Sequence, residues 1–333
     1  MIRYLKMENF RGVQSGTLEE LTSLVVLVGP NGSGKSTVLD ALLLGGAQNS
    51  LEALQVAANR RHSVGPNKSA KSFDEADFGA LFYKSAPYGS VSVRTETGAR
   101  RVVLRASGIG VEVRSQTSAS PILGDRDISP EEFFSDDKAD RGNRQLPGVY
   151  NVEIVDSRTA AGSGSLEEAY TLVSQRGLRK EVKSFVTEML PDVEDLEILA
   201  PKNVPTLHLN FKDHALPIGL AGDGIQLLLR LVMMLTSRAE STILLEEPET
   251  HMHPGAIRLV ARAIHAAVAR GVQVVLTTHS LELIDALTLG RPDEELKRVA
   301  VYRIALDEGQ LKTTRLDGQE VALARSSIED DLR

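Results

Sequence analysis

A glycine-rich segment between a buried strand and a helix constrains the fold of this chain most. Leu24–Val28 is a continuous run of apolar, mostly β-branched residues, which is typical of a strand buried on both faces of a parallel or mixed sheet. The next eight residues, Gly29–Ser36, read GPNGSGKS and fit the pattern G-x-x-x-x-G-K-[ST] completely. Ser36–Leu44 has a helical pattern that ends at Gly45. This order of strand, loop and helix predicts a P-loop α/β fold.

The chemistry of such a loop is the binding of phosphate groups. Its glycines let backbone N–H groups curl around an anion, and the start of the following helix adds positive potential. Lys35 is expected to reach the β- and γ-phosphates, and the Ser36 hydroxyl to bind Mg²⁺. We therefore expect ATP and Mg²⁺ as cofactors. The expected nucleotide-binding residues are Asn31, Gly32, Ser33, Gly34, Lys35, Ser36 and Thr37.

Two further segments supply the acid and base groups that ATP hydrolysis needs. The apolar run that begins at Thr242 ends in two acids, Glu246 and Glu247. We expect Glu246 to help bind Mg²⁺ through water and Glu247 to act as the general base for the attacking water. A later apolar run ends in Thr-Thr-His-Ser, which places His279 at the end of another strand, where ligands bind in α/β sheets. We expect His279 to contact the γ-phosphate.

The remaining pattern predicts one domain in two lobes. Short alternating runs around residues 91–113 indicate an antiparallel meander, and 165–190 indicates two helices around Gly177. Gly224–Leu235 is apolar on every side and is expected to be a buried helix. A strand–helix–strand–helix series over 242–287 and a hairpin over 298–315 follow. The charge-rich segment 125–144 is interpreted as a solvated surface excursion rather than a lid. The expected divisions are a P-loop and antiparallel lobe (1–124), a lid and helical insertion (125–215), and a half with the second acidic strand (216–333).

Composition excludes several classes of protein. The chain has 333 residues, no Cys and no Trp, and a formal net charge of -7. Disulfides, thiolate metal sites and cysteine nucleophiles are thereby excluded, and a surface that is basic overall is not expected. No apolar run is long enough to span a membrane, and the start lacks the apolar region of a signal peptide. We expect a cytoplasmic protein without membrane association.

These motifs together resemble an ATP-binding-cassette (ABC) ATPase. The block that begins at Glu246 and ends at Pro254 resembles the EEPE-x-H-x-HP block of the OLD (overcoming lysogenisation defect) ATPases. Phe10, Arg11 and Gly12 match the NFRG start of OLD-like, RecF-like and SMC-like heads. The fold that this resemblance implies is an ABC-ATPase head with a mixed β core, an antiparallel β meander and a helical subdomain. OLD-like ATPases without a Toprim nuclease domain are the nearest match, because no nuclease domain fits this chain.

The resemblance also implies a head-to-head dimer, in which a signature segment of one subunit covers ATP bound to the other. Gly219–Gly224 would form that segment, with Gly222, Asp223 and Gly224 binding the nucleotide, in place of the Leu-Ser-Gly-Gly-Gln of transporters. Since Asp223 would repel ATP, we expect it to cap the following helix instead. The Q-loop glutamine is either Gln48 or Gln55.

Other polar clusters receive weaker interpretations. His251 and His253 are expected in a loop at the dimer interface rather than at a metal, since there is no Cys and no third ligand near them. Two clusters are candidate basic patches for DNA, although such clusters are usually solvated. They are Arg100, Arg101 and Arg105, and Arg60, Arg61 and His62.

The leading functional hypothesis is an ATPase that dimerises around ATP and acts as a sensor or switch. Its effector would be separately encoded, a nuclease or toxin in antiphage defence, since the chain has no second catalytic centre. A RecF-like DNA-repair clamp is the main alternative, and a small-molecule P-loop kinase is a third. The sequence leaves open the trigger, any DNA binding, oligomers beyond a dimer, and whether ATP binding or hydrolysis drives the switch.

Overall fold

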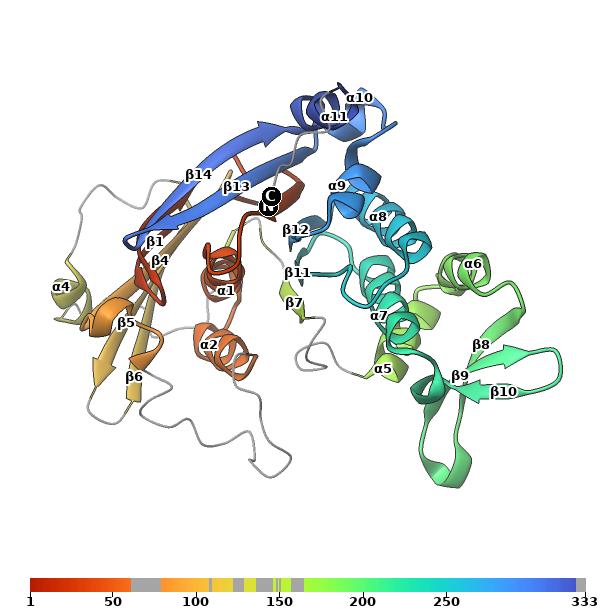
Figure 1. Ribbon diagram of the computed structural model, residues 1–333. Coiled ribbons are helices and arrows are strands. Elements are labelled where there is room, and N and C mark those ends of the chain that lie inside the picture. The colour runs from red at the N-terminus through yellow and green to blue at the C-terminus, as the bar shows by residue number, and fades with distance from the viewer. Residues whose placement is uncertain are drawn as a thin grey trace.

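The computed structural model describes residues 1–60, 79–107, 110–121, 129–135, 146–147, 149, 151–156 and 165–327. An eleven-stranded mixed sheet runs through these residues (Figure 1). In spatial order its strands are β6 (Gly110–Ser118), β5 (Ala99–Ser107), β4 (Tyr88–Thr95), β1 (Ile2–Phe10), β2 (Val13–Leu18), β14 (Gln310–Asp317), β13 (Val299–Asp307), β3 (Leu24–Val28), β12 (Gln273–Thr277), β11 (Thr242–Glu246) and β7 (Val152–Asp156). The strands from β13 to β7 are parallel, and those from β6 to β2 are antiparallel.

Helices cover both faces of the parallel part of the sheet. α1 (Lys35–Gly46) and α2 (Ser50–Asn59) lie on one face, whereas α7 (Asp223–Ser237), α8 (Pro254–Ala269) and α9 (Leu281–Thr288) lie on the other. Strand β3 is apolar throughout because both of its faces are buried. Val25 and Leu27 pack with α1, while Leu24, Val26 and Val28 pack with α7 and α8. The P-loop therefore begins at the end of a strand that is buried on both faces.

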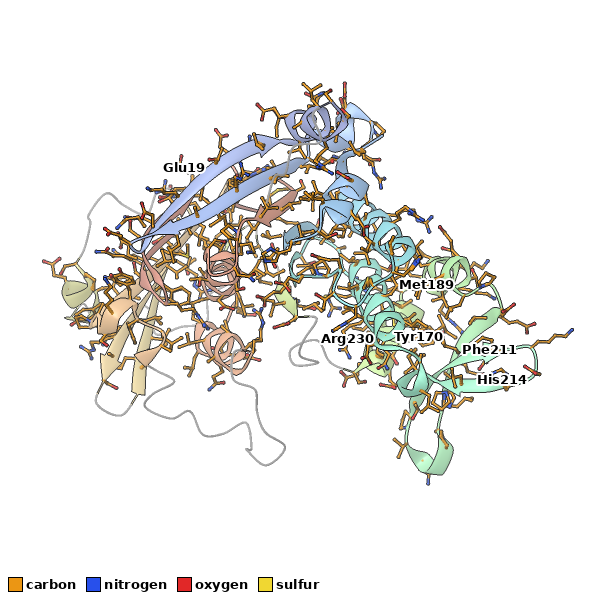
Figure 2. The ribbon with its side chains drawn as sticks, viewed as in Figure 1. Glu19, Tyr170, Met189, Phe211, His214 and Arg230 are labelled. Carbon is orange, nitrogen blue, oxygen red and sulfur yellow. The ribbon has the colours of Figure 1, made fainter. Side chains whose placement is uncertain are left out.

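A smaller unit projects from the α7 side of the sheet. It contains α5 (Leu166–Gln175), α6 (Arg179–Met189) and a three-stranded antiparallel sheet, β8 (Val193–Leu199), β9 (Thr206–Phe211) and β10 (Ala215–Pro217). The Tyr170 hydroxyl joins α5 to β8 by donating to the Leu196 carbonyl at 2.5 Å. At the far end, the rings of Phe211 and His214 stack with centroids 4.7 Å apart (Figure 2).

Most of the predicted elements are confirmed, and so is the fold class. The meander is β4 to β6, the helix pair around Gly177 is α5 and α6, and the all-apolar helix is α7. The C-terminal hairpin is β13 and β14, and it is followed by an unpredicted helix, α11 (Gly318–Ser327). A short helix, α10 (Asp293–Leu296), precedes the hairpin. Strand β7 and the small sheet were not predicted. The division into the three ranges remains a prediction.

The charge-rich segment 125–144 lies largely outside the described residues. Its described part contains α4 (Pro130–Ser135), where Phe133 and Phe134 are buried against Val103 of the meander. The interpretation of this part as a solvated excursion is wrong, because two aromatic side chains fix it to the sheet. None of the described helices has the length and apolar character needed to cross a bilayer.

Candidate nucleotide site

The loop between β3 and α1 has a shape that its glycines make possible. Gly29 has φ +143°, and a Cβ there would lie 2.2 Å from the carbonyl oxygen of Ile304 in β13. Gly32 and Gly34 have φ +78° and +95°, which side chains rarely adopt. Both the backbone angles and the passing strand therefore require this loop sequence.

Several polar groups of the loop are placed to receive an anion. Gly34 precedes α1 in a left-handed conformation, and no side chain caps this helix start. The Ser33 hydroxyl is buried and has no hydrogen-bond partner among the described residues. The Lys35 ammonium instead donates to the carbonyls of Gly29 at 2.8 Å and Pro30 at 2.9 Å. Burial lowers the pKa of Lys35, while Glu247 and Glu246 act in the opposite direction. The donor set fits phosphate oxygens.

The structure brings Ser36 next to Glu246. Glu246 ends β11 and is buried, and the Ser36 hydroxyl donates to its Oε1. A hydroxyl and a carboxylate oxygen are the hard ligands that Mg²⁺ prefers. The two expected magnesium residues therefore form one pair, although 210 positions separate them in the sequence.

Glu247 and His279 lie at the same edge of the sheet. Glu247 has φ +45°, an unusual angle for a residue other than glycine. Its N–H donates to the Thr277 carbonyl at 3.1 Å, which ties it to the end of β12. His279 Nε2 lies 3.8 Å from Glu247 Oε1. Both side chains remain about one third exposed, so the expected base and the expected phosphate contact face a common, accessible space.

Glu249 belongs to this edge as well, and the sequence analysis gave it no role. Its Oε1 accepts a hydrogen bond from the Thr278 hydroxyl at 2.5 Å and another from the His279 N–H at 3.1 Å. Burial raises the pKa of Glu249, and these hydrogen bonds act against that shift. Glu249 therefore fixes the backbone that carries His279. The repeated acids of the motif were the available signal for this role.

The proposed signature residues begin α7. Gly222 occupies the N-cap position without a side-chain hydrogen bond, and Asp223 is the first residue of the helix. The expectation that Asp223 caps the helix is wrong, because Asp223 lies one position too late to do so. Gly224 packs against the His251 carbonyl, and a Cβ at Gly224 would come within 2.7 Å of that oxygen. Leu220 just before is 73% exposed.

The two histidines of the motif have separate structural roles. His253 caps α8, with its Nδ1 accepting from the Gly255 N–H at 3.1 Å. His251 has φ +61° in the turn that supports α7. Within the described ranges, no group of three or more His, Asp or Glu side chains is arranged to hold a metal ion. The dimer-interface role of this loop remains a prediction.

Two of the arginines assigned to DNA patches are buried, Arg60 and Arg100. Arg100 is 1% exposed and donates to the Ala47 and Gln48 carbonyls, between α1 and α2. The Arg60 side chain is 0% exposed and contacts carboxylates near the P-loop. Arg105 pairs with Glu112 on the surface. Arg61 and His62 lie outside the described residues. The idea of two basic patches is therefore wrong for Arg60 and Arg100, which are inaccessible to DNA.

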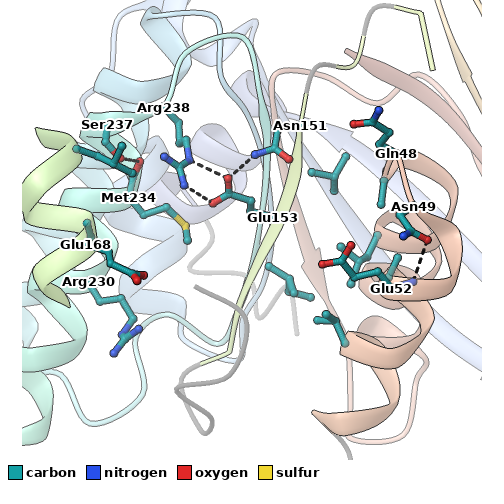
Figure 3. A pocket seen from close by; sticks show the side chains of 18 of the residues that line it. Gln48, Asn49, Glu52, Asn151, Glu153, Glu168, Arg230, Met234, Ser237 and Arg238 are labelled. Atoms are coloured by element: carbon teal, nitrogen blue, oxygen red, sulfur yellow. Dashed lines mark hydrogen bonds and ion pairs between the residues drawn. The ribbon is translucent and has the colours of Figure 1, made fainter. Parts of the chain in front are cut away.

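A cleft of about 670 Å³ lies apart from this site (Figure 3). Gln48, Asn49 and Glu52 line one side, and Arg230 and Met234 of α7 line the other. Of the two Q-loop candidates, only Gln48 lines the cleft, whereas Gln55 is exposed on α2. None of the P-loop residues lines the cleft, so the candidate site is the open edge of the sheet.

Structural comparison shows the same fold in heads of SMC proteins. An SMC head bound to the C-winged helix domain of ScpA has a TM-score of 0.59 and 13% identity, over 95% of this chain and 98% of that one. An Smc head with an extended coiled coil, bound to the C-terminal domain of ScpA derived from Pyrococcus furiosus, has a TM-score of 0.58 and 14% identity, over 99% of both chains. The SMC head domain from Thermotoga maritima has a TM-score of 0.50 and 13% identity, over 95% and 98%. The chain thus has the fold of an ABC-type, SMC-like ATPase head.

Comparison of the sequence gives two family matches. None of the curated proteins matches it. A family described as "AAA domain" matches residues 4–138. A second, described as "AAA domain, putative AbiEii toxin, Type IV TA system", matches residues 112–285, just over half of the chain. This protein therefore belongs to that second family of AAA-domain ATPases.

Proposed function

We propose that this chain binds and hydrolyses ATP as an OLD-like head, closing against a second copy around the nucleotide and thereby switching a separately encoded effector. The observation that carries the proposal is the meeting of Ser36 with Glu246 at the sheet edge where Glu247 faces His279. Acid, base and phosphate-binding groups from three separate segments converge there.

The residues have distinct roles in this reaction. Lys35 and the N–H groups of 31–37 bind the phosphates, and Ser36 and Glu246 hold Mg²⁺, which offsets phosphate charge. Glu247 accepts a proton from water as the water oxygen bonds to the γ-phosphorus and the bond from that phosphorus to the β–γ bridging oxygen breaks. His279 donates to the γ-phosphate. Gly222–Gly224 of the second copy cover the nucleotide from the other side. The products are ADP and phosphate.

The effector role draws support from the comparisons. The family description names a toxin of a type IV toxin–antitoxin system, and two of the similar heads are described as bound to a domain of ScpA. Both fit a head that acts on another protein, here a nuclease or toxin in antiphage defence. The RecF-like DNA clamp is less well supported, because Arg60 and Arg100 are buried.

Light scattering on Glu247→Gln tests the proposal. This change removes the base and leaves the phosphate-binding loop intact, so ATP and Mg²⁺ should convert the variant to a stable dimer. The matched control, Glu247→Gln with Lys35→Ala, should remain at its nucleotide-free mass. If Glu247→Gln binds ATP but has the same solution mass with and without ATP, the proposal that two copies close around ATP is wrong. Wild-type protein that releases no phosphate from ATP would contradict hydrolysis.

A further inference from the structure

A buried arginine lies beside the proposed magnesium pair and has no place in the mechanism above. Arg60 directly follows α2, and its side chain is fully buried. Its Nη1 donates to Asp40 Oδ1 at 2.9 Å, its Nε lies 3.5 Å from Asp156 Oδ2, and its Nη2 donates to Glu246 Oε2. One guanidinium thus contacts acids from α1, β7 and β11.

The charges around Arg60 require a cation at this position. Asp40, Asp156 and Glu246 are all buried, at 0%, 2% and 3% exposure. Asp156 and Glu246 are direct partners in the register of two parallel strands, so their charges repel each other. Arg11 contacts Asp40 at 3.3 Å. Buried carboxylates are strongly destabilising without a paired cation, and Arg60 is a cation that contacts all three of these acids.

Arg60 and the proposed metal draw on the same side chain. One oxygen of Glu246 accepts from Ser36 and the other from Arg60. A divalent cation held by Ser36 and Glu246 would lie within a few ångströms of the guanidinium and would repel it. Because Arg60 and the metal would share the single negative charge of Glu246, binding of either cation weakens the attraction of the other.

We propose that Arg60 is a positioning residue that holds Glu246 in the metal-free chain and is replaced there by Mg²⁺ when nucleotide binds. This inference rests on the magnesium role of Glu246 in the proposed function. Because Arg60 directly follows α2, release of Glu246 also removes one of the three acidic contacts that fix the end of this helix, which lines one side of the cleft. Arg60 thereby couples the metal at the nucleotide site to α2.

Arg100 provides a matched control. It is equally buried and also fixes α2, at the opposite end, but its described hydrogen bonds go to neutral oxygens, those of Ala47, Gln48, Ser50 and Ser115. Loss of Arg100 should destabilise the fold, yet the partners just named carry no charge that a metal ion could neutralise. Mg²⁺ should not reverse that loss.

The experiment measures melting temperature without nucleotide, in magnesium chloride and in sodium chloride of equal ionic strength. Arg60→Gln should melt lower than wild type in sodium chloride and regain several degrees in magnesium chloride. For wild type, the melting temperature should be the same in magnesium chloride as in sodium chloride. The same should hold for Arg100→Gln, at a lower temperature. An equal response of Arg60→Gln and Arg100→Gln to magnesium would show that Arg60 is merely structural.

A second measurement covers the case in which Arg60→Gln does not fold. Arg60→Lys keeps the charge but loses the forked geometry. Titration of a fluorescent ATP analogue against magnesium chloride should show half-maximal binding at a Mg²⁺ concentration several-fold lower in Arg60→Lys than in wild type. An unchanged midpoint would overturn the inference while leaving ATP binding intact. Failure of wild type to bind the analogue at all would instead overturn the proposed function.

Discussion

The two glycine-containing loops of the proposed nucleotide site differ in what makes glycine necessary. In the P-loop, Gly29 has a left-handed φ, and the β13 backbone leaves no room for a side chain. In the signature segment, Gly219 and Gly222 have no atom within 4 Å of a would-be Cβ, and Gly222 has an ordinary φ of -61°. The first loop is specified by its own chain. In the second loop only Gly224 has such a reason, because it packs against the His251 carbonyl, and the described residues give none for Gly219 or Gly222.

This difference indicates where the second loop finds its contacts. An open glycine at the start of a helix exposes N–H donors that another molecule can approach closely. The neighbouring Leu220, at 73% exposure, is among the most exposed large apolar side chains of the described residues. Both features fit a surface that is completed by a nucleotide bound to a second copy. The comparison therefore distinguishes a phosphate site built within one chain from a loop that, under the proposed function, is completed by a partner.

Lys35→Ala tests whether the P-loop is the phosphate site, and we expect it to have the largest effect. The ammonium now bonds to two carbonyls of its own loop. We expect ATP affinity to fall about 100-fold, equivalent to about 2.7 kcal/mol, because the phosphates lose their charge-assisted donor. Isothermal titration calorimetry with Mg²⁺ and ATP measures this change. Wild-type affinity in a folded Lys35→Ala protein would show that the loop is not the phosphate site.

Gly222→Asp tests whether the signature segment contacts the nucleotide of a second copy. Aspartate is a favourable N-cap residue, so the melting temperature should stay the same or rise. Its charge would face the phosphates of the partner's ATP, and we expect ATP-dependent association to weaken about tenfold, equivalent to about 1.4 kcal/mol. Gly222→Ser, an equally good cap without charge, is the control and should associate nearly as well as wild type. Association measured by sedimentation that is equal in both variants would remove the signature segment from the interface.

The parts of the site that were predicted from sequence are those whose chemistry is local. Residues 29–36 form strand end, loop and helix start within one stretch, so the pattern alone specifies the geometry. The acids after β11 and the histidine after β12 were placed at one edge because parallel strands end together.

The rest depends on long-range contacts. Arg60 reaches Glu246 across 186 positions, and its neighbours Arg61 and His62 made it resemble part of an exposed basic cluster. Asp156 belongs to β7, a five-residue strand. Its neighbour in the sheet is β11, which lies far away in the sequence. Whether a charged residue is buried is decided by its tertiary neighbours, which no local pattern contains.

The smallest expected effect is a pH dependence of stability that comes from Glu249. It shows whether Glu249 only holds the backbone of His279 or also affects the stability of the whole fold. Burial raises the folded-state pKa of Glu249 above its ordinary value of 4.5. Stability contributed by this group is therefore complete below pH 4.5 and is lost as pH rises through the raised pKa. Glu249→Gln can still accept hydrogen bonds from Thr278 and His279 but does not ionise. Its melting temperature should gain on that of wild type as pH rises from 4.5 toward neutrality. A constant difference across that range would mean that Glu249 is already well compensated as a carboxylate, and that its two hydrogen bonds outweigh its burial.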